Sequence, residues 1–398
     1  MQDDKKIAVS VIIPIYNVMK YLPHTMECLR RQTFDDFEVI CVDDNSYDDS
    51  FLLLTNYQYT FDKLILHKNE KNLGAGECRN IGLSIAKGEY VIFLDADDHF
   101  QDNLLENLYR KGQKQKADVI VYYTGHFVDG SPKMYIPDRK GKNVIYVSTY
   151  PILSDAKTRP YIYELITNSP FDKMVKKDLL IDHQIRFPNY PYTEDMVYSY
   201  ESILIASKVV FLDEVMYFHR RKREGSLSQQ ICEKKSYIIE VLDDILFFEK
   251  ERGMLPIQEN SFWKFALHRI YQALNTISKN NYDDLLFRAR EFLMEHYIPF
   301  RKTITSKSHM ILCDSIYDSI MKDDVSEEYT DILRKNQIII WKNNTKKVLV
   351  LLNNIFANIL YKRKKLTDYY INDELLGYRQ LIIANVSMLL SKIKNYKA

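Results

Sequence analysis

The sequence of 398 residues is poor in cysteine and has almost no excess of charge of one sign. Its five cysteines are odd in number and scattered, and no two of them form a Cys-x-x-Cys pair. This usage predicts a reducing compartment, without a disulfide framework or a zinc site. The net charge of +1 argues against a dedicated nucleic-acid binder, because such proteins usually carry a basic excess. We therefore expect no nucleic-acid partner.

The chain also lacks long hydrophobic runs. No window approaches the roughly 18 to 20 consecutive apolar residues that span a bilayer. The N-terminal stretch MQDDKKIAVSVIIPIYN contains no apolar segment of signal-peptide length. These absences predict a cytoplasmic location, including the inner face of the cytoplasmic membrane.

The N-terminal third of the chain alternates buried-strand patterns with helix patterns. Strand patterns occur at 9–14, 37–44, 63–67, 89–95 and 118–123, and helix patterns at 21–31, 49–59, 75–86 and 104–116. This alternation predicts a doubly wound α/β sheet. Ligands of such sheets bind beyond the carboxyl ends of the strands. Three of those ends read PIYN, DDNS and DADD, so the polar groups gather where a site is expected.

The pattern changes along the rest of the chain. Residues 125–150 resemble a loop, and a short strand at 209–212 precedes the basic segment HRRKREGSLSQ. After about residue 233 the chain reads as long amphipathic helices. We expect two domains, an α/β domain at 1–230 and a mostly α-helical domain at 231–398. The second would contact the acceptor, a membrane surface or another copy of the chain.

The segment DADD places three carboxylates, Asp95, Asp97 and Asp98, directly after a buried strand. Burying this much negative charge is costly unless a cation lies beside it. Carboxylate oxygens suit hard cations such as Mg²⁺ and Mn²⁺, which can bridge to diphosphate oxygens. The alternative is an acidic turn that caps the helix starting at Leu104.

Two longer stretches resemble the nucleotide-sugar domain of family 2 glycosyltransferases, which have the GT-A fold. They are VSVIIPIYNVMKYLPHTMECLRRQTFDDFEVICVDDNSYDDS and NEKNLGAGECRNIGLSIAKGEYVIFLDADD. The resemblance is close over residues 7–127 and looser to about 230. It implies a GT-A α/β fold with a doubly wound mixed sheet. It also implies an inverting enzyme that moves one sugar from a nucleotide-sugar, most often a UDP-sugar, to a hydroxyl group.

The resemblance implies that the nucleotide binds at the first two strand ends. Tyr16 would lie against the uracil ring, and Asp44 would accept the N3–H of the base. Pro14, Asn17 and Asp43 would shape the same wall. An acid that accepts one ring N–H discriminates between bases, because a mismatched base leaves that acid unpaired. Asparagine and aspartate at these places are also common turn and N-cap residues, and both roles can hold together.

The resemblance implies that the diphosphate and the sugar of the donor bind at DADD and at the loop NLGAGECRN. Asp97 would ligate Mn²⁺ or Mg²⁺, Asp95 would contact the ribose or the surroundings of the metal, and Ala96 would lie between them in the donor site. Arg79 would lie near the diphosphate, and a surface arginine on a helix is the alternative. His219 is a further candidate metal ligand, and a structural histidine is the alternative there.

A second acidic pair, in YTEDMVYSYESIL, opens a predicted helix. In the resembling family the aspartate of this pair is the general base, which assigns that role to Asp195. It would take the proton of the acceptor hydroxyl as the oxygen attacks the anomeric carbon. Both carboxylates lie at the positive end of the helix dipole, so plain helix capping is the alternative.

The C-terminal region contains an amphipathic segment, TKKVLVLLNNIFANILYKRKK, at 345–365. Its apolar side chains share one helical face and basic clusters flank it. This pattern is typical of a helix at the surface of an anionic membrane, and also of a helix packed on its own domain. Peripheral membrane contact through this segment and homo-oligomer formation both stay open.

These features together predict a metal-dependent glycosyltransferase. The expected acceptor is a glycan or lipid-linked glycan in the synthesis of a bacterial capsule, lipopolysaccharide or exopolysaccharide. Two alternatives remain. An NDP-sugar nucleotidyltransferase would carry a Gly-rich loop with a basic residue after its first strand, which PIYNVMKY lacks. A non-catalytic scaffold of a glycan-assembly complex would not need Asp97 and Asp195.

Overall fold

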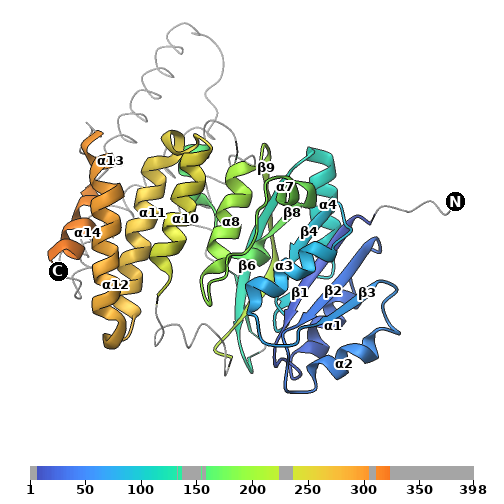
Figure 1. Ribbon diagram of the computed structural model, residues 1–398. Coiled ribbons are helices and arrows are strands. Elements are labelled where there is room, and N and C mark those ends of the chain that lie inside the picture. Colours follow the sequence, from blue (N-terminus) through green and yellow to red (C-terminus); the bar gives the residue numbers. More distant parts are fainter. Residues whose placement is uncertain are drawn as a thin grey trace, which may run out of the picture. The chain divides into compact units, whose positions relative to one another are not determined.

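The structure is a computed structural model (Figure 1). It describes residues 7–131, 133–136, 154, 158–223, 236–303 and 311–322. The chain divides into Met1–Tyr329 and Thr330–Ala398, and the described residues all lie in the first of these units.

Nine of the described strands form a single sheet, in the order β3-β2-β1-β4-β8-β6-β9-β5, with β7 paired to β6. Strands β1 to β4 are parallel neighbours, whereas β8 runs antiparallel to both β4 and β6. This arrangement confirms the predicted mixed α/β sheet. The strand bounds are β1 Val9–Ile15, β2 Phe37–Asp43, β3 Leu64–Lys68, β4 Tyr90–Phe93, β5 His99–Phe100, β6 Val119–Val128, β7 Met134–Tyr135, β8 Lys173–Lys176 and β9 Val209–Arg221.

The sheet is buried on both faces, which explains the continuous apolar runs of its strands. Alternate residues of β1 enter different cores, because successive side chains of a strand point to opposite faces. Ile12 packs in the core that includes residues of α3 and α8, and Val11 in the core that includes residues of α1 and α4. The helix bounds in this part are α1 Leu22–Arg30, α2 Ser50–Tyr57, α3 Ala75–Ile85, α4 Leu104–Gln115, η1 Arg159–Tyr161, α6 Ile162–Leu165, η2 Pro170–Asp172, α7 Lys177–Asp182 and α8 Glu194–Ile205.

Helices follow the sheet from Ile238 onward, and in Figure 1 they lie next to α8. Helix α10 packs on α8, and α11 packs on α10 and α14. The predicted boundary near residue 230 therefore lies inside one compact unit, because α10 buries its apolar face in the core that also contains α8. Two functional domains, 1–230 and 231–398, stay a prediction. The helices are α10 Ile238–Glu251, α11 Leu255–Thr276, α12 Lys279–Phe292, the π-helical η4 Leu293–Tyr297, α13 Ile298–Thr303 and α14 Ile311–Lys322.

Strand β9 is longer than the sequence predicts. It extends to Arg221, so the first part of the expected basic loop is a strand, and β6 extends to Val128 beside it. The two strands pair in parallel with register shifts next to Tyr123. Pairing between segments about ninety residues apart stabilises these extensions, and local sequence patterns do not report it.

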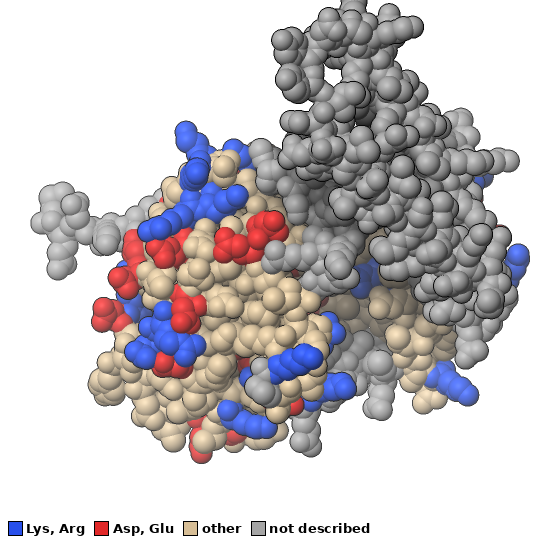
Figure 2. All heavy atoms as spheres, turned by 180° about the vertical axis from the view of Figure 1, so that it is seen from behind, with Lys and Arg blue, Asp and Glu red and all other residues tan. Residues whose placement is uncertain are grey.

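The described surface carries charges of both signs. Figure 2 shows acidic and basic side chains close together on the face seen from behind, in keeping with the net charge of +1. Within the described ranges, no helix combines the length and the hydropathy that crossing a membrane requires. The amphipathic segment at 345–365 lies outside the described residues.

Candidate active site

The candidate site lies where β1, β2 and β4 end next to one another in the sheet. The loop after β1 and the loop after β2 are joined by hydrogen bonds. The backbone N–H of Asn17 donates to Ser46 Oγ at 3.0 Å, and the Asn17 side chain accepts the N–H of Tyr47 at 3.0 Å. Asn17 has a left-handed backbone with φ of 50°, which asparagine tolerates better than most residues. The turn role considered for Asn17 is therefore present, and a direct nucleotide contact stays a prediction.

Tyr16 and Pro14 lie at the end of β1. The Tyr16 ring is 44% exposed and meets Tyr47 edge to face, with 6.3 Å between the centroids. Pro14 pairs with Val42 of β2 inside the sheet. The exposed Tyr16 ring offers a flat surface of the kind that stacking on a base requires.

The two aspartates after β2 have different surroundings. Asp44 is buried, and its carboxylate accepts three hydrogen bonds of 2.8 Å from Asn69 Nδ2 and from the backbone N–H groups of Leu73 and Gly74. It therefore holds the loop that leads into α3. Asp43 is also fully buried, and its Oδ1 has no hydrogen-bond partner. An unpaired buried oxygen is costly, and a contact between Asp43 and the nucleotide stays a prediction.

Arg79 joins the two acidic motifs. Its guanidinium donates to Asp95 Oδ1 at 3.0 Å and to Glu194 Oε1 at 3.1 Å. Arg79 is only 6% exposed and lies 5.3 Å from the centroid of the Phe187 ring. The planar guanidinium can serve two carboxylates at once because its donors form a rigid fork. Arg79 is thus a buried bridge and not the surface arginine of the alternative interpretation.

Asp97 lies beside Arg223, with 3.3 Å between Oδ2 and Nε. Burial and the neighbouring charge of Asp98 raise the pKa of Asp97 to about 7, although Arg223 acts against this shift. The ionised form of Asp97 therefore needs a nearby positive charge. Its backbone carbonyl accepts a hydrogen bond of 2.6 Å from Arg220 Nε.

Asp98 is completely buried and anchors the acidic turn to β9. Its carboxylate accepts hydrogen bonds from Tyr217 Oη at 2.5 Å, from His219 Nδ1 at 3.0 Å and from the backbone N–H of Arg220 at 2.6 Å. Burial disfavours the imidazolium form of His219, but the hydrogen bond and charge of Asp98, together with Asp95 and Asp97, outweigh it and raise the pKa of His219 to about 9. His219 is therefore the charge partner of Asp98.

Each carboxylate of DADD thus faces a cation of the protein: Arg79 for Asp95, Arg223 for Asp97 and His219 for Asp98. Ala96 is buried between them, and its carbonyl accepts a hydrogen bond from Thr25 Oγ1 at 2.7 Å.

The donor set also fits a hard divalent cation, since its carboxylate oxygens are the ligands such ions prefer. Ligand atoms of Asp95, Asp98 and His219 lie within 4.8 Å of one another. This group, among the described residues, does not include Asp97, whose role as ligand stays a prediction. Binding a cation at His219 would displace the proton that this imidazole carries.

Asp195 lies in the first turn of α8, next to Glu194. The residue before them, Thr193, has φ of 66°, a left-handed backbone that is rare for a β-branched residue and marks local strain. Burial and the adjacent Glu194 charge raise the pKa of Asp195 to about 7, with Arg79 and Lys173 acting in the opposite direction. A carboxylate with a pKa near neutrality suits a general base.

Known proteins are similar to this chain in sequence and in fold. The profile of the family described as Glycosyl transferase family 2 matches residues 10–182. Glycosyltransferase GlyG of Streptococcus pneumoniae is 32% identical over 225 residues, which cover 55% of this chain and 72% of GlyG. The chain belongs to glycosyltransferase family 2. The cholesterol galactosyltransferase of Borreliella burgdorferi is 28% identical over 306 residues, 71% of this chain and 80% of that protein.

The fold of this glycosyltransferase is also that of a solved structure. Residues 1–349 of TarS from S. aureus, in complex with UDP-GlcNAc, align with a TM-score of 0.63 and 23% identity. The alignment covers 81% of this chain and 92% of that one. This alignment shows the GT-A fold. Membership of the family shows that the chain is a glycosyltransferase and thus an enzyme, and neither the nucleotidyltransferase nor the scaffold alternative agrees with that membership.

Sequence patterns missed several residues of the glycosyltransferase site. Tyr217 donates to Asp98 and accepts the backbone N–H of Asp95 at 3.1 Å, so it orients both acids. Arg220 donates to Asp98, to the Asp97 carbonyl and to Asp129 Oδ1 at 2.8 Å, so it fixes the acidic turn against β9. Both residues lie on β9, whose extension to Arg221 only tertiary pairing reveals.

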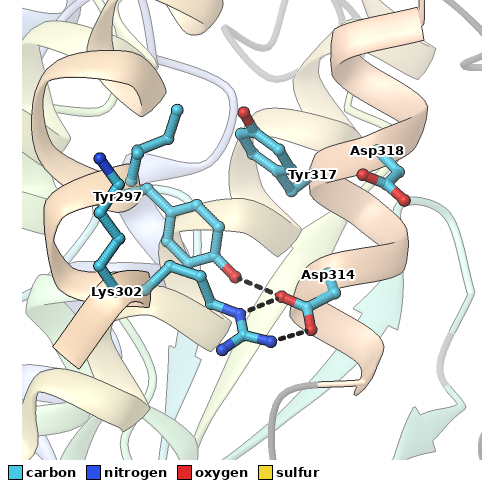
Figure 3. Close-up of a pocket in the computed structure, with 7 residues that line it drawn as sticks. Tyr297, Lys302, Asp314, Tyr317 and Asp318 are labelled. Atoms are coloured by element: carbon cyan, nitrogen blue, oxygen red, sulfur yellow. Dashed lines mark hydrogen bonds and ion pairs between the residues drawn. The ribbon is translucent and has the colours of Figure 1, made fainter. Parts of the chain in front are cut away.

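A separate hollow of about 480 Å³ lies between α13 and α14, and Figure 3 shows its lining residues. Asp314 is paired there with Arg301 at 2.5 Å and 2.6 Å and accepts a hydrogen bond from Tyr297 Oη at 3.3 Å. Arg301 thus neutralises the charge of Asp314 within the fold. It holds none of the predicted site residues.

Proposed function

We propose that the glycosyltransferase moves one sugar from a UDP-sugar to a hydroxyl group of a glycan or lipid-linked glycan, with inversion at the anomeric carbon. The observation that carries this proposal is the Arg79 bridge. It places the donor motif at Asp95 and the acidic pair Glu194–Asp195 around one buried guanidinium. A donor site and a base close to one cation suit displacement of the nucleotide diphosphate by an acceptor hydroxyl.

Asp195 acts as the base. In its ionised form it accepts the proton of the acceptor hydroxyl as that oxygen attacks the anomeric carbon. Burial keeps its pKa near 7, so a large fraction is ionised at neutral pH while the carboxylate stays basic enough to take a proton. Arg79 and Glu194 hold the start of α8 in place and thereby orient Asp195.

Asp97, with Asp95 and His219, would hold Mg²⁺ or Mn²⁺. When bound, this cation would neutralise the charge that develops on the leaving diphosphate. Arg223 beside Asp97 is placed to give way to the metal or to add a second positive charge toward the phosphates.

Two relatives support the donor and acceptor classes. TarS is described as a poly(ribitol-phosphate) beta-N-acetylglucosaminyltransferase and was solved with UDP-GlcNAc. The Borreliella relative is described as a cholesterol galactosyltransferase. Both activities transfer a sugar to a hydroxyl of a polymer or a lipid, and we propose the same class of reaction for this chain. Residues 231–398 would contact the acceptor, a membrane surface or a second copy of the chain.

A panel of UDP-sugars with Mn²⁺ or Mg²⁺ tests the proposal. We expect slow hydrolysis of one donor by the full chain, measured as released UDP and free sugar. Asp97→Ala should lower this rate by at least about a hundredfold, and Asp195→Asn should abolish transfer to an acceptor while UDP binding persists. The exposed Asp62→Ala variant is the control. Wild-type rates in both site variants would contradict the proposal.

A further inference from the structure

A second cluster of metal-ligating side chains lies outside the site described above. His24 and Cys28 project from α1, and His99 comes from β5. One ligand atom of each lies within 4.8 Å of the others. The spacing of four residues between His24 and Cys28 places both on one face of the helix. Cys28 is buried, whereas His24 is exposed, so the cluster is open to solvent on one side.

The separations within this cluster match those that a tetrahedral zinc ion imposes. His24 Nε2 lies 3.1 Å from His99 Nδ1, and Cys28 Sγ lies 3.7 Å and 3.5 Å from these two nitrogens. Zn–N bonds of about 2.0 Å and Zn–S bonds of about 2.3 Å at tetrahedral angles require about 3.3 Å between nitrogens and about 3.5 Å between nitrogen and sulfur.

Hydrogen bonds alone do not account for all three contacts. A ring nitrogen of neutral imidazole either donates or accepts, and a thiol has one proton. If His24 donates to His99, the thiol can also donate to His99, and the contact between His24 and Cys28 is left without a linear hydrogen bond. One cation at the centre of the triangle satisfies the three atoms together.

The surrounding charges are compatible with a cation. Burial raises the pKa of the Cys28 thiol, and Arg31 Nη2, 3.7 Å from Cys28 Sγ, acts against this shift toward the thiolate, which is the form that binds metals. The charge of Arg31 is offset by Asp102 at 3.1 Å and by Glu27 at 3.9 Å. A thiolate, two imidazoles and a water molecule complete the four-coordinate set that zinc prefers.

We propose that His24, Cys28 and His99 bind one Zn²⁺ ion that fastens α1 to β5. The position gives this site a structural role. His99 follows Asp98 directly, and α1 is already joined to the acidic turn by Thr25, which donates to the Ala96 carbonyl. The ion therefore connects α1 to the residue that follows the DADD turn. It is distinct from a divalent cation at Asp97. The cysteine spacing predicts no zinc site, and the proposal departs from that prediction because two of the ligands are histidines and one comes from a distant strand.

Cobalt substitution tests this proposal on the full-length protein after removal of metals with a chelator. Co²⁺ added to the wild type should produce a thiolate-to-cobalt charge-transfer band that saturates at one ion per chain and disappears on addition of Zn²⁺. His24→Ala and Cys28→Ser should lose the band and bind Zn²⁺ at least about tenfold more weakly. His24 is exposed, so its variant is expected to fold normally, and circular dichroism checks this.

Two control variants separate this site from others. His183→Ala removes an exposed histidine directly after α7 and should keep the band. Asp97→Ala should also keep it, because the oxygen ligands of the donor site produce no thiolate band. Zn²⁺ should raise the melting temperature of Asp97→Ala but not of the double variant Asp97→Ala/His24→Ala. A wild type without the band, or a band that survives His24→Ala, would overturn the proposal.

Discussion

Arg79 is the residue that connects the two halves of the site. It is buried between Asp95 and Glu194, and a single ammonium group cannot reach both carboxylates with the geometry of a guanidinium. Replacing Arg79 would leave one buried carboxylate without its cation, and an unpaired buried charge destabilises the fold.

We expect Arg79→Lys to lower kcat/KM by at least about tenfold, equivalent to about 1.4 kcal/mol, and to lower the free energy of unfolding by about 1–3 kcal/mol. Steady-state kinetics and denaturant unfolding measure the two effects. Arg110→Lys is the matched control, because Arg110 forms an exposed ion pair with Glu106 within one helix and should change neither quantity appreciably. Unchanged kinetics in Arg79→Lys would refute the bridging role.

Asp195 should make the reaction depend on pH. Its pKa is raised to about 7 by burial and by Glu194, and only the ionised form accepts a proton. We therefore expect kcat/KM to increase as pH rises from 6 to 8, with an apparent pKa of about 7. A pH–rate profile measures this, and a profile that is flat over this interval would contradict the assignment.

The raised pKa of Asp195 affects stability in the opposite direction, so stability should fall as pH rises. A carboxyl group whose pKa is higher in the folded state favours folding while it is protonated, and this contribution disappears as pH rises through about 7. Asp195→Asn should consequently melt at a higher temperature than the wild type at pH 8, with a smaller difference at pH 5.

At the scale of elements, the close approach of α3 to the start of α8 positions the acidic pair. A Cβ atom at Gly76 would lie 2.8 Å from Glu194 Cγ and 3.3 Å from Phe187 Cβ. The absence of a side chain at Gly76 therefore permits the contact that brings Arg79, on the same helix, to Glu194.

We expect Gly76→Ala to displace the start of α8 and to lower kcat by at least about tenfold in protein that is still folded. Gly112→Ala on α4 is the matched control. Its Cβ would also meet close neighbours, Ile120 at 3.0 Å and Tyr90 at 3.2 Å, but these lie away from the site. Both variants should lower the melting temperature, and only Gly76→Ala should lower kcat. Equal kcat values in the two variants would argue against this positioning.

At the scale of the whole molecule, the transferase sheet and helices α10–α14 belong to one unit that ends at Tyr329. We expect a chain without Thr330–Ala398 to bind UDP as the full chain does, because the site residues described here all lie before that boundary. The removed part carries the basic amphipathic segment at 345–365, so recovery with anionic vesicles should fall. Sedimentation with vesicles and a UDP titration measure both quantities. Equal vesicle recovery of the two proteins would contradict a membrane role for this segment.

The sequence by itself determined the parallel strands β1 to β4 and the helices between them, and it predicted the place of the candidate site. These features follow from local periodicity and from the rule that strand ends carry ligands, so short segments such as VSVIIP and DADD are sufficient to predict them. The resemblance to family 2 glycosyltransferases came from the same segments.

Only the tertiary structure decided which charges meet. Arg79 and Glu194 are 115 residues apart, and Asp98 and His219 are 121 apart. Their pairing depends on how β8 and β9 join the sheet, which no local pattern contains. The cation partners of the three acids, the length of β9 and the meeting of His24 and Cys28 with His99 depend on that long-range pairing. A buried charge is stabilised by its neighbours in space, and the fold supplies those neighbours.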